Sequence, residues 1–303
     1  MIRRLIFVLV ACLLVGCGPS TAATGDVTPV FAFTEAVVGP NRLPLGIIQN
    51  GSPLNDPSAL VTATFYNLDI DKTKAIGNSK AIYYGKGLPA AVYVAAFDFP
   101  VVGNYGVQID TVIAGQSSQA NIQLTVTERA IAPKIGDLAR SAKTLTTATV
   151  TDPKELSSAA IEEPSLYATS LDEALVAHKP IALLFATPGF CRTAVCGPSL
   201  KVFAALAKTY GSTVTFIHSE IYRFPFGDSF AQQNEIFQKA MNEGRNLTDA
   251  ERKTGVSDAY YAWNLQSEPW LFLINSNGVI VGRYEGGLTQ EELSPVLAKL
   301  NEQ

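Results

Sequence analysis

The chain has 303 residues, of which 47% are hydrophobic and 17% charged, and its formal net charge is −4. This length suits about two domains, and the apolar content excludes a largely disordered chain. The sequence contains no block of Lys and Arg, so we expect no nucleic-acid partner.

The first residues, MIRRLIFVLVACLLVGC, predict export and lipidation. Arg3 and Arg4 precede an apolar stretch, Leu5–Val15, which is too short for a permanent transmembrane helix and is typical of a signal-peptide core. The stretch ends in Leu-Val-Gly-Cys, which resembles a bacterial lipobox. The resemblance implies cleavage before Cys17 and acylation of Cys17, for example with palmitate. An ordinary signal peptide that contains a cysteine is the alternative.

Residues 17–30, which follow the predicted signal peptide (1–16), are small and polar and predict a lipidated tether. The lipobox would then place the protein in the cell envelope, anchored to a membrane on the extracytoplasmic side. Such a compartment permits disulfides.

The segment 31–128 alternates between apolar and other residues, as in Tyr105, Val107 and Ile109 with Gly, Gln and Asp at the intervening positions. Gly, Pro and Asn separate these runs. Short strands with this spacing predict an antiparallel, immunoglobulin-like β-sandwich. Tyr105 also resembles the corner tyrosine of that fold, whose hydroxyl bonds back to the backbone.

The segment 129–165 has no sustained period and is rich in Ala, Thr, Ser and Pro, which predicts a linker that is partly wrapped on a neighbouring domain. From residue 166 onward, predicted strands and helices alternate. They comprise a short helix capped by Ser170, a buried strand over 181–186, a helix that ends near Gly211, a strand in TVTFIHSEIY, a hairpin around Asn275–Gly278 and a last helix with Thr289 and Glu292 at capping-box spacing.

The stretch FATPGFCRTAVCGPSL, residues 185–200, holds Cys191 and Cys196. On an ideal helix, Cα atoms five residues apart are about 8.6 Å apart, whereas a disulfide needs less than about 7 Å. Both cysteines therefore cannot lie on one helix and bond. Pro198 favours a helix that begins there, which places Cys196 at the helix entrance and Cys191 in the preceding loop.

A strand, cysteines, a helix and a strand, followed by a Pro, a hairpin and a terminal helix, resemble a thioredoxin-like fold over residues 166–303. The resemblance implies a cis bond between Glu268 and Pro269, in a loop that faces the cysteines. It also implies that Phe190, Glu268, Pro269 and Trp270 bind a substrate. The predicted fold class is therefore an all-β immunoglobulin-like domain followed by an α/β thioredoxin-like domain.

The segment departs from the thioredoxin pattern in several places. Phe190 stands where the family has Trp, and four residues instead of two separate the cysteines. Leu183 and Leu184 are apolar, where thioredoxins often keep a buried carboxylate. A long polar insertion with scattered aromatic residues occupies residues 220–260.

These features leave two hypotheses. In the first, Cys191 and Cys196 are the catalytic pair of a thiol–disulfide oxidoreductase that acts on exported proteins with thiols or disulfides. Cys191 is the preferred attacking thiol, and Cys196 is the alternative. In the second, the protein is a non-enzymatic envelope scaffold whose cysteines form a structural disulfide. A copper-handling protein of this fold would need a distant His, and nothing marks His218 as a ligand. We expect no cofactor and no metal.

Overall fold

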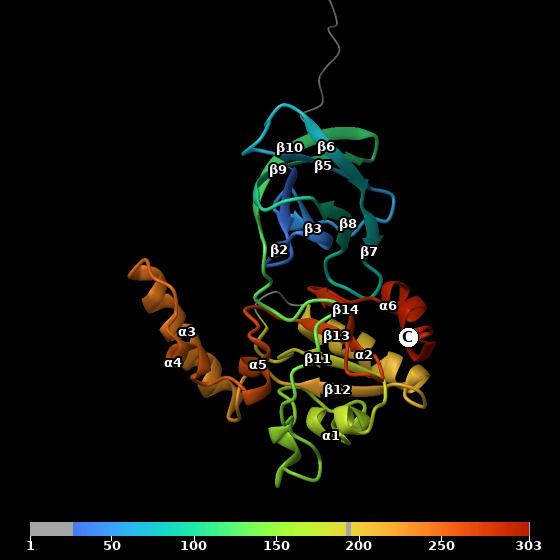
Figure 1. Cartoon of the computed structure of the whole chain (residues 1–303), viewed down its shortest axis with the longest axis vertical. Helices are drawn as coiled ribbons and strands as arrows, with labels where there is room; N and C mark the ends of the chain where they lie inside the picture. Colours follow the sequence, from blue (N-terminus) through green and yellow to red (C-terminus); the bar gives the residue numbers. More distant parts are fainter. Residues whose placement is uncertain (1–26, 192–194, 303) are drawn as a thin grey trace, which may run out of the picture.

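The structure is a computed structural model of the chain and describes residues 27–191 and 195–302. The predicted signal peptide and Cys17 lie outside the described residues. Figure 1 shows an all-β N-terminal domain and an α/β C-terminal domain arranged along the long axis of the molecule. No helix in the described part of the chain is both long enough and apolar enough to cross a bilayer.

Two five-stranded sheets form the N-terminal domain. One has the order β1-β3-β8-β7, with β4 paired to β3, and the other has the order β2-β10-β9-β5-β6. The strands of the first sheet are β1 (Val27–Phe31), β3 (Gly39–Gln49), β4 (Ser52–Pro53), β7 (Ile82–Tyr84) and β8 (Val92–Phe99). Those of the second are β2 (Ala36–Val37), β5 (Leu60–Asn67), β6 (Ala75–Lys80), β9 (Gly103–Ile113) and β10 (Gln116–Thr127).

One apolar core fills the space between the sheets, and it includes Leu43, Leu45, Ile47, Phe65, Val107 and Ile109. Alternate residues of β9 are buried, in the phase that the sequence predicts. The hydroxyl of Tyr105 donates a hydrogen bond to the Val101 carbonyl at 2.8 Å, which is the bond expected of a corner tyrosine. The domain is thus an immunoglobulin-like β-sandwich.

Strand β1 corrects the predicted end of the tether. The sequence predicts a tether over residues 17–30, but residues 27–30 lie in β1, which pairs antiparallel with β3 from Val27 opposite Gln49 to Phe31 opposite Leu45. The β-branched residues of this segment suit a pleated strand. The sandwich therefore includes residues 27–30.

A four-stranded sheet with the order β12-β11-β13-β14 forms the centre of the C-terminal domain. The strands are β11 (Ile181–Phe185), β12 (Thr215–Ser219), β13 (Trp270–Ile274) and β14 (Ile280–Glu285). Strand β11 is parallel to β12 and antiparallel to β13, and β13 and β14 form the predicted hairpin. All five residues of β11 are buried, because helices cover both faces of the sheet.

Helices α2 (Cys196–Tyr210) and α6 (Gln290–Leu297) pack on one face of the sheet, and α1 (Leu171–Val176) and α5 (Asp258–Trp263) pack on the other. The described chain also has the 3₁₀ turns η1 (Pro153–Glu155), η2 (Pro164–Tyr167) and η3 (Leu300–Glu302). Ser170 and Thr289 are the N-cap residues of α1 and α6, as predicted. This arrangement is a thioredoxin-like fold.

The insertion over residues 220–260 forms an arm. It contains helix α3 (Phe226–Asn242), helix α4 (Asp249–Lys253) and the start of α5. Figure 1 shows α3 and α4 projecting sideways from the domain, with α5 at the base of the arm. The arm is held together by Arg245, which makes two hydrogen bonds of 2.8 Å to the Glu251 carboxylate.

The segment 129–165 is packed on the C-terminal domain over much of its length. Leu138 forms an antiparallel bridge with Val279, and the Ala139 amide donates to the Gly278 carbonyl at 2.8 Å. Further along, Leu156 is only 3% exposed and belongs to the same apolar cluster as α2. The segment is therefore structurally part of the C-terminal domain.

Polar contacts join the two domains. Thr34 donates to the Glu285 carboxylate from its amide, at 2.9 Å, and from its hydroxyl, at 2.8 Å. Arg283 of β14 forms an ion pair with Glu35, and its guanidinium lies 4.8 Å from the centre of the Trp270 ring. The sandwich is thus attached to the strand hairpin that carries the predicted substrate loop.

Candidate active site

Cys191 and Cys196 form a disulfide whose Cα atoms are 6.0 Å apart. Helix α2 begins at Cys196, and Cys191 lies in the loop before it, as the spacing argument predicts. Pro198 is the third residue of the helix, within the first turn, where its missing amide removes no intrahelical bond. The N-terminus of a helix favours the thiolate form of a cysteine placed there, whereas apolar burial opposes it.

The two cysteines differ in their exposure to solvent. Cys196 is completely buried and belongs to the apolar cluster beneath α2. Cys191 is partly buried and packs against the edge of the same cluster. An incoming sulfur can therefore approach Cys191 more readily than Cys196.

The loop before β13 faces the disulfide. The Glu268–Pro269 bond is cis, as the family resemblance implies. A carboxylate oxygen of Glu268 and the sulfurs of Cys191 and Cys196 all lie within 4.8 Å of one another. The Thr187 amide, just after strand β11, donates to Glu268 Oε2 at 2.7 Å and so fixes the carboxylate at this point.

The other two predicted substrate-binding residues have different surroundings. The ring of Phe190 is partly exposed and packs on Phe230 of the arm, with ring centres 5.6 Å apart. Trp270 is only 2% exposed, and its indole stacks on Phe272 and donates to the Ser267 hydroxyl at 2.8 Å. The Trp270 side chain therefore stabilises the interior and offers almost no surface to a substrate.

A buried carboxylate, Glu220, lies just after strand β12. Its Oε1 accepts hydrogen bonds from the Ser158 amide at 2.6 Å and from the Ser158 and Ser157 hydroxyls at 2.9 and 3.2 Å. Its Oε2 has no hydrogen-bond partner among the described residues. Burial raises the pKa of Glu220 to about 7, although the hydrogen bonds from Ser158 and Ser157 oppose that shift.

His218 is buried in strand β12 and has a structural role. Its Nε2 lies 3.0 Å from the Ala186 carbonyl, which can only accept, so Nε2 carries the proton. The Tyr167 hydroxyl lies 2.7 Å from Nδ1 and donates to it. Burial lowers the pKa of His218 to about 4, which keeps the ring neutral. Both ring nitrogens of His218 are therefore engaged in hydrogen bonds within the protein.

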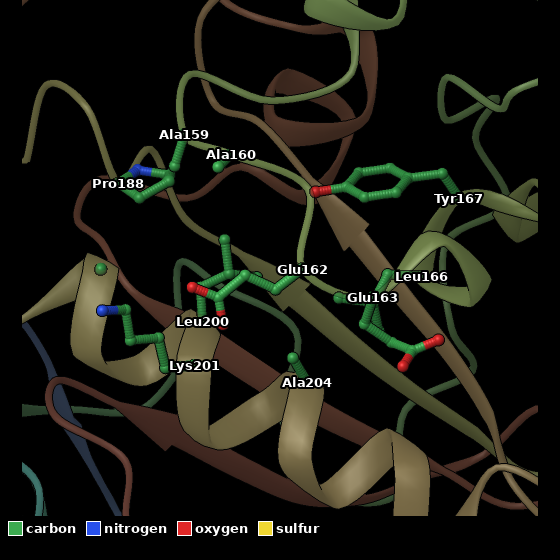
Figure 2. Close-up of a pocket in the computed structure, with 11 residues that line it drawn as sticks. Ala159, Ala160, Glu162, Glu163, Leu166, Tyr167, Pro188, Leu200, Lys201 and Ala204 are labelled. Atoms are coloured by element: carbon green, nitrogen blue, oxygen red, sulfur yellow. The ribbon is translucent and has the colours of Figure 1, made fainter.

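A pocket of about 410 Å³, including space open to solvent, lies beside the first turns of helix α2. Figure 2 shows that it lies between helix α2 and the segment over residues 159–163. Its lining is mostly apolar, with three charged side chains at its borders: Glu162, Glu163 and Lys201. Pro188 and Gly197, which lie before and after the two cysteines in the sequence, also line the pocket. The sequence gives no signal for this pocket, because it depends on how the segment 129–165 packs.

The fold and the site together define a two-domain protein that joins an immunoglobulin-like β-sandwich to a thioredoxin-like domain with a disulfide at the start of helix α2. Residues 167–301 match the family model of the thioredoxin-like domain. No curated protein matches the chain.

Some solved structures are similar to part of the chain. A DUF4426 family protein from Pseudomonas aeruginosa PAO1 is 12% identical and covers 36% of this chain and 96% of its own, with a TM-score of 0.27. The PmoD soluble domain from Methylocystis is 12% identical and covers 33% of this chain and 88% of its own, with a TM-score of 0.21. A superoxide reductase from Ignicoccus hospitalis is 16% identical and covers 35% of this chain and 84% of its own, with a TM-score of 0.22. With scores this low, these likenesses indicate nothing about function.

Proposed function

We propose that the protein is a thiol–disulfide oxidoreductase of the cell envelope, and that Cys17 anchors it to a membrane through lipid. One observation carries the redox proposal. The Cys191–Cys196 disulfide lies at the start of helix α2, with one sulfur buried and the other accessible, and it faces the loop that contains cis-Pro269. An asymmetric pair of this kind suits two-step disulfide exchange.

In the proposed reaction, the reduced protein meets an exported protein that contains a disulfide. The Cys191 thiolate attacks one partner sulfur, and the other partner sulfur leaves as a thiolate. The Cys196 thiolate then attacks the Cys191 sulfur, which forms the Cys191–Cys196 bond and releases the second partner thiolate. Two electrons pass to the partner, and the reverse sequence would oxidise a dithiol.

The test is a trapping experiment in the cell envelope. We expect Cys196→Ser to accumulate mixed disulfides with partners, because attack by Cys191 is retained and release is lost. Cys191→Ser is the matched control and should trap nothing. Trapping by Cys191→Ser alone would reverse the two roles, and trapping by neither variant would contradict the redox proposal.

A structural disulfide is the second candidate function, because Cys196 belongs to the apolar cluster beneath α2. In that case the protein would be an envelope scaffold, and either Ser variant would only lower the melting temperature. The reduction potential separates the two functions. A value far below about −300 mV would indicate a structural bond that envelope thiols do not reduce.

The anchoring proposal rests on the lipobox-like Leu-Val-Gly-Cys sequence. Cys17→Ser should abolish lipidation and move the protein out of the membrane fraction. Mass spectrometry of the mature N-terminus and membrane fractionation measure both effects. An unchanged mass and an unchanged distribution would contradict the anchor and leave the redox proposal intact.

A further inference from the structure

The disulfide has a third potential ligand group beside it. A carboxylate oxygen of Glu268 lies within 4.8 Å of the sulfurs of both Cys191 and Cys196. In the described part of the chain, this is the only group of at least three His, Cys, Asp or Glu side chains that comes so close together. The three donors come from a loop, a helix start and the cis-Pro loop, so the fold itself assembles them.

We infer that the protein, once the disulfide is reduced, binds a zinc ion through Cys191, Cys196 and Glu268. Zinc takes thiolate and carboxylate ligands in a tetrahedral arrangement. With Zn–S bonds of about 2.3 Å, tetrahedral geometry separates two thiolate sulfurs by about 3.8 Å. A Cα separation of 6.0 Å lets two cysteine side chains reach one ion, because a change of χ1 between staggered rotamers can move the two sulfurs apart once the disulfide is reduced.

The surroundings support the three ligands. The Thr187 amide holds Glu268 Oε2 at 2.7 Å, which orients the carboxylate as an outer-shell partner does in metal sites. The N-terminus of helix α2 favours the thiolate form of Cys196. The Tyr260 hydroxyl donates to the Ser267 carbonyl at 3.4 Å and is not one of the three donors.

The donor set selects among metals. Two thiolates exclude Ca²⁺ and Mg²⁺, which prefer oxygen ligands throughout. A carboxylate oxygen suits Zn²⁺ better than Cu⁺, which favours sulfur. Three protein ligands leave the fourth position of zinc for water or for a group of another molecule.

Zinc binding by these three side chains depends on the redox state of the two cysteines, because the disulfide must first be reduced. A thiol reductant supplies two electrons and two protons and converts the disulfide to two thiols. Zn²⁺ then displaces both thiol protons and binds two thiolates and one carboxylate. The oxidised protein cannot bind zinc in this way. The inference goes beyond the proposed function, because it needs only reducible cysteines, and trapping of partners tests the exchange reaction separately.

The experiment uses the whole mature chain, reduced with a phosphine under anaerobic conditions and titrated with Co²⁺ and then Zn²⁺. We expect one Co²⁺ per chain, with thiolate-to-cobalt charge-transfer absorption and the visible bands of tetrahedral cobalt, and displacement of cobalt by zinc. The oxidised protein and the Cys191→Ser, Cys196→Ser double variant should show none of these bands. Stoichiometric binding by either of them, or none by the reduced protein, would overturn the inference.

Glu268→Gln tests the third ligand and should weaken zinc binding at least about tenfold. Glu291→Gln is the control, because Glu291 is an exposed carboxylate paired with Lys86 at 3.9 Å. Equal affinity for Glu268→Gln and the unmodified protein would remove Glu268 from the site. If Glu268→Gln does not fold, X-ray absorption spectroscopy of the zinc-loaded unmodified protein identifies the atoms bound to zinc instead. Two sulfur ligands with oxygen ligands support the site, and four sulfur ligands would indicate zinc shared between two chains.

Discussion

Arg42 of the sandwich and Glu292 of helix α6 form a bidentate ion pair across the domain boundary, with Nε–Oε1 and Nη2–Oε2 distances of 2.7 and 2.8 Å. The side chains are only 14% and 9% exposed. Arg42 Nη1 also donates to the Glu285 carbonyl at 2.8 Å. The pair therefore connects the sandwich with both the last strand and the last long helix of the thioredoxin-like domain.

Replacing Arg42 by Ala should destabilise the protein by about 3 to 5 kcal/mol, because it leaves the Glu292 carboxylate buried without its partner. Urea unfolding of the whole chain measures this change. Lys86→Ala is the control, since Lys86 and Glu291 form an exposed pair at the same boundary. It should cost less than about 1 kcal/mol. Similar effects of the two substitutions would show that Arg42 contributes no special coupling.

A fragment of residues 130–303 should be more stable than a fragment of residues 165–303. The sequence alone favours a folded unit that begins near Ser165, but the structure buries Ala132 and Leu156 in the C-terminal domain. The shorter fragment loses these contacts and exposes the apolar surface that they cover. Thermal unfolding of both fragments gives the comparison. Equal melting temperatures would mean that the segment 129–165 adds no stability.

Glu220 should make stability depend on pH. Its pKa is raised from 4.5 to about 7 in the folded protein, so the folded state binds the proton more tightly than the unfolded state. The contribution of Glu220 is then fully present below pH 4.5 and is lost as the pH rises to about 7, with a total of about 3 kcal/mol.

Glu220→Gln tests this dependence, since an amide does not titrate. The free energy of unfolding of the variant, minus that of the unmodified protein, should increase by about 2.5 kcal/mol from pH 5 to pH 8. Chemical denaturation at the two pH values measures it. A difference that is independent of pH would show that Glu220 titrates normally in the folded state.

In the reduced protein, Cys191 should react with an alkylating reagent roughly tenfold faster than Cys196, because Cys196 is completely buried. Peptide mass spectrometry after brief labelling at low reagent concentration gives both rates. Labelling after denaturation is the control, and there the two rates should converge. Faster labelling of Cys196 in the folded protein would assign the attacking role to Cys196.

The sequence predicts the elements whose signal is local. The run over residues 181–186 is apolar at every position, which a strand covered on both faces requires, and β11 is buried throughout. Pro269 predicts the loop beside the cysteines because a short stretch around it resembles the family pattern. The spacing of Cys191 and Cys196 predicts that two bonded cysteines cannot both lie on one helix. In the structure only Cys196 is helical.

The sequence could not predict features that depend on distant residues. Arg42 and Glu292 are 250 residues apart, and nothing near either one marks the pair. Glu220 receives its hydrogen bonds from a segment that appears, in the sequence, to be a linker. Helix α3 of the insertion over residues 220–260 is amphipathic, yet only Phe226 and Ala240 of its residues are buried. Its local pattern therefore does not indicate that it projects from the domain.

The pairing of residues 136–139 with β14 also bears on how copies of this protein behave together. Strand β14 is at the edge of its sheet, and the Gly136 amide donates to the Ile280 carbonyl while the Ile280 amide donates to the Asp137 carbonyl, at 2.8 and 2.9 Å. An open strand edge is a template on which a second molecule can add its own strand. The chain covers the beginning of this edge with its own backbone, so these backbone groups are already paired and a second molecule cannot add a strand there.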